Sequence, residues 1–224
     1  MKVDLVEKVE DDVARFLPYE SGGAGGYFNF KTNPELISKV LEDFKPWESY
    51  RAVRVFCDLL AWLNGPMSQF EASDCAFREP GPYTGSAVSK AFQCSGRLML
   101  LFRDLRLNVS QQYPCGLRYS IRGSLQRIDP DFQWGFIRIS RSWAYFDELL
   151  LPEQLKHGEE TVLTFYAWGD NEQETMENLE RVFINVSGCF QHLADPKAPK
   201  ARKNVAQGAG PGNSNRSAIH TALP

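Results

Sequence analysis

The sequence has few of the residues and motifs that enzyme active sites commonly use. Its 224 residues include only three histidines, at positions 157, 192 and 220, and no G-x-S-x-G motif. No serine or cysteine has a histidine at a recognisable catalytic spacing. Because catalytic triads assemble in space, this absence makes a hydrolase less expected without excluding it. We favour a non-enzymatic protein and leave the question of catalysis open.

Cysteine motifs are missing as well. The five cysteines, at positions 57, 75, 94, 115 and 189, form no C-x-x-C pair, so zinc-knuckle and thioredoxin-like spacings are absent. Cys189 and His192 lie three positions apart on one predicted helix, as half of a metal site would. No second pair of ligands is evident, so we interpret Cys189 as a packed apolar side chain and His192 as a helix-end residue. We expect no metal and no cofactor.

The chain also has no long apolar run. The longest strongly apolar run, Leu98 to Phe102, is much shorter than the ~20 residues that a membrane-spanning helix needs. Charged residues interrupt the first seven positions, unlike the apolar centre of a secretion signal. An odd number of cysteines without such a signal favours free thiols in a reducing compartment. We therefore expect no membrane association and a cytoplasmic location.

The net charge is only −3, but acidic and basic residues are concentrated in separate blocks of the sequence. Residues 1–80 carry 9 basic and 14 acidic side chains, and residues 142–195 carry 2 basic and 11 acidic ones. Between them, residues 97–141 hold 8 basic side chains, all arginine, against 3 acidic ones. Residues 196–224 hold 5 basic side chains and no acidic ones. We interpret the alternation first as compensation within the molecule.

Hydrophobic periodicity predicts three helices in the first 65 residues. Residues 3–17 place apolar side chains at helical spacing opposite charged positions. A cap and proline pattern at Asn33-Pro34 predicts a short helix to about residue 44. Residues 46–64 form the strongest predicted helix, stopped by Gly65-Pro66. We interpret the run from Ser21 to Gly26 as a flexible loop. The alternative, a phosphate-binding loop, is less favoured because the run lacks the GK[ST] ending and a preceding strand.

The second half alternates strands and helices. Strands are predicted at 97–103, 132–141 and 161–168, helices at 114–128 and 172–193, and a short irregular strand at 69–77. From 97 to 193 the order is β-α-β-β-α, which matches most of a split βαβ arrangement. The predicted fold class is therefore α+β, with N-terminal helices packed on a split βαβ-like antiparallel sheet layer. We expect one domain over residues 1–195, helical over residues 1–65 and sheet-containing over residues 88–195, and a disordered basic tail over residues 196–224.

Strand parity predicts two apolar sheet faces, because alternate residues point to opposite sides of a strand. One face holds Ile137, Ile139, Leu163 and Phe165, and the other holds Trp134, Phe136, Tyr166 and Trp168. We expect the two C-terminal helices to cover the first face and the helix at 46–64 to cover the second. If the second face were open instead, its aromatic side chains would form a partner-binding surface.

Two carboxylate clusters could serve acid/base chemistry or bind magnesium: Glu71 with Asp74, and the run Asp170 to Glu172. We place the first cluster in a loop. The second lies at a predicted helix start, where capping of the helix explains it.

The arginines give the strongest functional indication. Arg118 and Arg122 are predicted on the polar face of the 114–128 helix, and Arg138 and Arg141 on the next strand. Arginine rather than lysine suits two-pronged contacts to carboxylate or phosphate. The strand beginning at Phe132 faintly echoes an RNA-recognition sheet, but it lacks the leading Arg-Gly and has the wrong place in the strand order. We treat that echo as coincidence.

These observations favour a non-enzymatic protein-binding module, comparable with bacterial immunity, antitoxin or chaperone-like proteins that occupy a partner protein's surface. The expected binding residues are Arg118, Arg122, Arg138, Arg141, Trp134 and Trp168. The alternative is an anion or nucleic-acid binding protein, or an enzyme on a phosphorylated or nucleic-acid substrate, that uses the arginine-rich segment 97–141. A steep salt dependence of binding to polyanions would favour the alternative.

Overall fold

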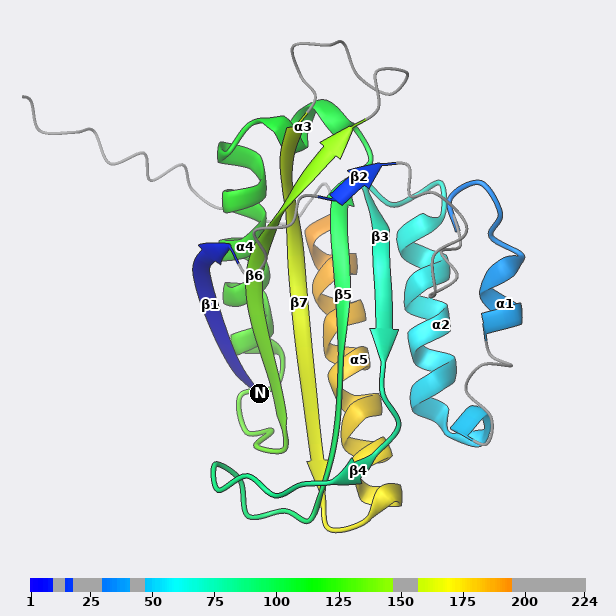
Figure 1. Cartoon of the computed structure of the whole chain (residues 1–224), viewed down its shortest axis with the longest axis vertical. Coiled ribbons are helices and arrows are strands. Elements are labelled where there is room, and N and C mark those ends of the chain that lie inside the picture. Colours follow the sequence, from blue (N-terminus) through cyan, green and yellow to red (C-terminus); the bar gives the residue numbers. More distant parts are fainter. Residues whose placement is uncertain (10–14, 18–29, 41–46, 147–156, 195–224) are drawn as a thin grey trace, which may run out of the picture.

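The computed structural model describes residues 1–9, 15–17, 30–40, 47–146 and 157–194. Its long strands form one mixed sheet in the order β1-β6-β7-β5-β3 (Figure 1). They are β1 (Lys2–Val9), β6 (Gly135–Phe146), β7 (His157–Gly169), β5 (Phe92–Phe102) and β3 (Phe70–Phe77). Two short strands extend the sheet, because β2 (Arg15–Leu17) pairs with β6 and β4 (Gly81–Pro82) pairs with β5. The predicted α+β fold class is confirmed.

The second half of the chain follows the predicted β-α-β-β-α order. Helices α3 (Leu105–Val109) and α4 (Gln112–Ile128) connect β5 to β6, and α5 (Glu172–Ala194) follows β7. Strands β5 and β6 are each antiparallel to β7, which lies between them, so they are parallel to one another. This is the split βαβ arrangement. All three strands are longer than predicted.

The predicted helix over 3–17 is wrong, because this segment contributes β1 and β2 to the sheet. Val3 is buried and Leu5 half-buried, whereas Lys2 and Asp4 are exposed, which is the two-residue alternation of a strand. Strand β1 runs parallel to β6, with Val3 opposite Ile137 and Leu5 opposite Ile139. Pairing with a distant strand therefore overrides the local helical spacing. Residues 10–14 of the predicted helix lie outside the described residues.

The other two N-terminal helices are found where they were predicted, although residues 41–46 lie outside the described residues. Helix α1 (Leu36–Val40) lies within the predicted 34–44 helix, and the 46–64 prediction corresponds to a 3₁₀ turn at Trp47–Ser49 followed by α2 (Arg51–Asn64). Strand β3 confirms the irregular strand predicted near residue 70, with its pairing to β5 shifted between Ala72 and Asp74. The glycine-rich run 21–26 and the tail 196–224 lie outside the described residues.

Helices α2, α4 and α5 all lie on one face of the sheet (Figure 1). There the side chains of Ile137, Leu163 and Phe165 pack against the helices in one hydrophobic core. This core includes residues from both ends of the described chain, such as Met1 and Phe190. The ring centroids of Phe56 on α2 and Phe183 on α5 are 4.8 Å apart, and those of Phe165 and Phe183 are 4.9 Å apart. The two C-terminal helices thus cover the predicted face, with α2 beside them.

The prediction that the helix at 46–64 covers the second sheet face is wrong. Among the described helices, only α3 packs on that face, at one end, where Leu105 and Val109 contact Leu101, Ala144 and Phe146. Farther along, polar residues such as Arg97, Thr164 and Arg138 interleave with the aromatic ones. This face is therefore less apolar than its aromatic content indicates, and α2 buries more apolar area beside α5. We call it the second face.

No helix among the described residues combines the length and apolar character needed to cross a membrane. All five cysteines are free thiols.

Candidate functional site

Arg118 does not lie on the polar face of its helix, contrary to the prediction. The buried side of α4 repeats at helical spacing through Leu117, Arg118, Ile121 and Leu125. Arg118 is only 1% exposed, so its guanidinium points inward, toward β7. Arg122, one turn later, is exposed. The two arginines that looked equivalent by spacing therefore occupy different environments.

Arg118 and Arg141 share one buried carboxylate, that of Glu159 on β7. Arg118 Nη1 donates to Glu159 Oε2 at 3.0 Å, and Arg141 Nη1 donates to Glu159 Oε1 at 2.7 Å. Arg118 also contacts the Glu7 carboxylate of β1 at 3.3 Å, and Arg141 Nε donates to the Glu7 carbonyl. The network joins β1, α4, β6 and β7. Because carboxylates already occupy both guanidinium groups, it is a structural ion network rather than an open anion site.

Three other arginines of the 97–141 block also have internal partners. Arg97 pairs with Asp74 on β3 through both Nε and Nη2, and Arg106 pairs with Asp104. Arg103 donates to the carbonyls of Leu63 and Gly65 at the end of α2. These contacts support the interpretation of the charge blocks as compensation within the molecule. They also explain Asp74 and Glu71 as strand residues in ion pairs, since Glu71 meets Lys31 at 2.6 Å.

The second face carries a continuous row of four aromatic side chains, Phe136, Tyr166, Trp168 and Tyr83, which we call the aromatic row. Successive ring centroids are 5.6, 5.8 and 6.2 Å apart, with the first two pairs stacked and the last edge-on. Lys2 of β1 lies 5.8 Å from the Phe136 ring centroid. Phe136, Tyr166 and Tyr83 are half-buried. The row crosses β6 and β7 and ends on the segment that follows β4.

Trp168 is the most enclosed member of the aromatic row. It is 8% exposed, and its indole Nε1 is buried without a hydrogen-bond partner. Its backbone N–H donates to the carbonyl of Trp134, which fixes the start of β6 against the end of β7. Trp134 itself is half-buried against the main core. The two predicted tryptophans are thus neighbours, but only Trp168 belongs to the aromatic row.

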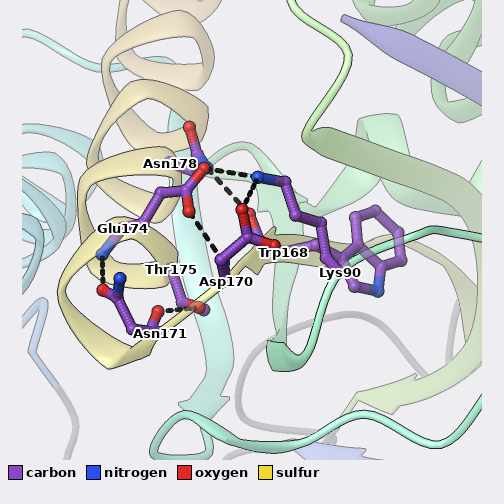
Figure 2. A network of polar contacts seen from close by, with 7 residues as sticks. All are labelled: Lys90, Trp168, Asp170, Asn171, Glu174, Thr175 and Asn178. Atoms are coloured by element: carbon purple, nitrogen blue, oxygen red, sulfur yellow. Dashed lines mark hydrogen bonds and ion pairs between the residues drawn. The ribbon is translucent and has the colours of Figure 1, made fainter.

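Lys90 ties the segment after β4 to the start of α5 (Figure 2). Its amino group lies 2.7 Å from Asp170 Oδ2 and 2.6 Å from Glu174 Oε1, and 4.5 Å from the ring centroid of Trp134. Its side chain is only 9% exposed. Hydrogen bonds from Lys90 hold the pKa of the Glu174 carboxyl below its usual range, and the bonds to Asp170 and Glu174 raise the pKa of Lys90.

The carboxylates at 170–174 therefore have more than the capping role predicted for them. Asn171 is the residue whose side chain caps α5, because its Oδ1 accepts from the Glu174 N–H at 2.9 Å. Glu174 Oε2 accepts from the Asp170 N–H at 2.7 Å, close to a capping-box arrangement (Figure 2). Asp170 is then left to pair with Lys90. Sequence reasoning missed Lys90 and Tyr83, because nothing in their local pattern indicates contacts with residues so distant in the chain.

The six predicted binding residues do not form one site. Arg118 and Arg141 belong to the buried ion network, Arg122 is exposed on α4, and Trp134 and Trp168 lie at the opposite end of β6 and β7. Arg138 lies on β6 with its side chain on the second face, half-buried and opposite Thr164. Of these six, Arg138 and Trp168 therefore share a surface with the aromatic row.

Metal and thiol chemistry find little support in the described residues. They contain no group of three or more histidine, cysteine, aspartate or glutamate side chains able to hold a metal. Cys189 is buried and His192 exposed, so the two do not form a common site. Burial raises the pKa of the Cys189 and Cys57 thiols to about 11, and a thiol that stays protonated at neutral pH is a poor nucleophile.

Comparisons with known proteins give no relative. The chain matches no protein-family model, and no curated protein or solved structure matches it.

Proposed function

We propose that this chain is a non-enzymatic protein-binding module whose interface is the second face around the aromatic row. The observation that carries the proposal is a row of four aromatic rings on a sheet face where α3 is the only described helix to pack. Large aromatic side chains that are partly enclosed and surrounded by polar groups are the usual anchors of protein interfaces. Arg138 and Lys2 provide the polar rim.

A protein partner fits this surface better than a polyanion does. Nucleic-acid binding depends on arginine and lysine side chains that are free to neutralise phosphates. Here Arg97, Arg106, Arg118 and Arg141 already pair with carboxylates of the same chain. The alternative of an anion or nucleic-acid binder, or an enzyme on such a substrate, therefore gains no support from these four arginines.

The proposal extends to the kind of protein and its location. A compact chain that lacks a recognisable catalytic constellation and presents one aromatic face suits an immunity, antitoxin or chaperone-like protein that occupies a partner's surface. Free thiols suit a reducing compartment, and the proposed location is therefore the cytoplasm.

The test is affinity capture with matched surface variants. The full chain, Phe136→Ser, Tyr166→Ser and the control Tyr119→Ser are immobilised and exposed to extract of the native host at moderate salt. Tyr119 is 54% exposed on α4, on the other side of the sheet from the aromatic row. We expect one protein that the wild type and the control retain and both row variants lose. Equal retention by all four, or recovery of nucleic acid alone, would contradict the proposal.

A further inference from the structure

Residues 83–91, which join β4 to β5, form a strap across one end of the aromatic row. The sequence Tyr-Thr-Gly-Ser-Ala-Val-Ser-Lys-Ala consists mainly of small side chains and has neither helix nor strand structure. Its base is closed by a hydrogen bond from the Tyr83 N–H to the Ala91 carbonyl at 2.7 Å. Residues 84–87 are exposed, so the middle of the strap buries little apolar area. Segments with few buried contacts are the ones that open locally without unfolding the whole protein.

Two side chains hold this strap to the rest of the protein, one near each end. Tyr83 packs edge-on against Trp168, with ring centroids 6.2 Å apart. Lys90 reaches across to Asp170 and Glu174 (Figure 2). Its amino group also lies over the ring of Trp134. Lys90 is therefore the latch. Its contacts are with the β7–α5 turn, which the hydrogen bonds of Asn171 and Glu174 hold in place independently.

One polar group next to the strap is unsatisfied. The indole N–H of Trp168 is buried and has no acceptor. A buried donor without a partner destabilises the state that buries it, because water would otherwise bond to it. Opening the strap removes the Tyr83 ring from Trp168 and lets this N–H meet an acceptor.

We propose that the strap 83–91 regulates the aromatic row, with Lys90 as its latch and Trp168 as the anchor that opening exposes. This rests on the proposed function, because it concerns access to the same surface. The ligand group implied is a carbonyl oxygen of a partner protein, which accepts a hydrogen bond from Trp168 Nε1 while the partner packs on the stacked rings. Lys90 acts on binding through the strap and is a positioning residue.

The first test needs no partner. The exchange of the Trp168 indole proton with solvent is measured by NMR, the signal being assigned with Trp168→Phe, in the wild type, Lys90→Met and the control Arg106→Met. Lys90→Met keeps a long apolar side chain but removes both ion pairs, whereas Arg106→Met removes an exposed pair with Asp104 elsewhere. We expect exchange about tenfold faster in Lys90→Met and unchanged in the control. If the Trp168 indole proton exchanges at the wild-type rate in Lys90→Met, the proposal that Lys90 holds the strap closed is wrong.

A second variant guards against general destabilisation. Glu174→Gln keeps Lys90 and the bond from the Asp170 N–H but removes one charge from the latch, and it should speed the exchange of Trp168 by a smaller factor. The backbone amides of the core residues Ile137 and Leu163 should exchange at wild-type rates in both variants. If the core amides accelerate as much as Trp168, the effect is global and the latch is refuted.

The second test separates the strap from the proposed function. In the capture experiment Lys90→Met should retain more partner than the wild type, whereas Tyr166→Ser should retain none. If Tyr166→Ser binds normally, the proposed interface fails, whatever the strap does. If Tyr166→Ser loses the partner but Lys90→Met binds no better despite faster indole exchange, the interface stands and the regulatory role fails.

Discussion

Arg118 Nη1 lies 3.0 Å from Glu159 Oε2, with only 1% of the arginine side chain and 3% of the glutamate side chain exposed. The arginine is on α4 and the glutamate on β7, and their contact joins the helix layer to the sheet. A buried ion pair adds little stability over an apolar pair of the same size, but losing one partner leaves a charge buried alone. This asymmetry gives the first prediction.

Replacement of Arg118 by methionine should destabilise the protein by about 1.5–3 kcal/mol, because the buried Glu159 loses one charged hydrogen bond and keeps Arg141 as an ion-pair partner. The matched control is Arg122→Met, one turn along the same helix and exposed, which should change stability by no more than about 0.5 kcal/mol. Urea unfolding of both variants checks the difference. Equal effects would mean that Arg118 does not lie inside the protein as described.

Two glycines should respond oppositely to alanine. A Cβ at Gly158 would run into the backbone of Asn108, which cannot move away as a flexible side chain can, so Gly158→Ala should destabilise by about 1–3 kcal/mol. Gly188 lies inside α5 with nothing within 4 Å of an added Cβ, so Gly188→Ala should stabilise by about 0.5–1 kcal/mol. Thermal unfolding of the two variants measures both signs. A stable Gly158→Ala protein would contradict the position of α3 against β7.

Asp129 should make stability depend on pH in the acid range. A two-pronged hydrogen bond from Arg181, helped by Asn185, holds the pKa of the Asp129 carboxyl below its usual range. A depressed pKa in the folded state adds stability above the unfolded pKa of about 3.9, and this is lost as pH falls through the folded pKa. The free energy of unfolding of the wild type should exceed that of Asp129→Asn by about 1 kcal/mol at pH 6. This difference in stability should shrink below pH 4. A gap that is independent of pH would refute this.

Residues 196–224 should be dispensable for folding, because their composition offers almost no large apolar side chains for a core. Truncation after Asp195 should leave the melting temperature within a few degrees of that of the full chain. Differential scanning calorimetry of the two proteins makes the comparison, and a loss of cooperative unfolding on truncation would sink the idea.

The second half of the fold could be predicted because its signals are local. Helix α5 carries an apolar stripe over 23 residues and a cap at Asn171, and β7 is a dense β-branched and aromatic run. The prediction of the first helix fails because β1 is defined by its partner β6, more than a hundred residues away. Helical spacing within 3–17 contains no information on that pairing.

The candidate site could be predicted only partially, and for a related reason. Parity correctly groups Phe136, Tyr166 and Trp168 on one face, since alternation is a property of the strand itself. The cover of that face, the burial of Arg118 and the latch at Lys90 depend on contacts between segments far apart in the chain. Lys90 and Glu174, for example, are separated by 84 residues. No periodicity could reveal them.

The most direct test of the account is a footprint of the captured partner on the full chain. Hydroxyl-radical labelling reports the solvent accessibility of individual side chains with and without the partner. We expect protection of Phe136 and Tyr166 in the complex, while Tyr119 and Tyr113, exposed on α4, are labelled equally in both states. Protection of the two α4 tyrosines with the aromatic row still fully labelled would show that the partner binds elsewhere and contradict the proposed interface.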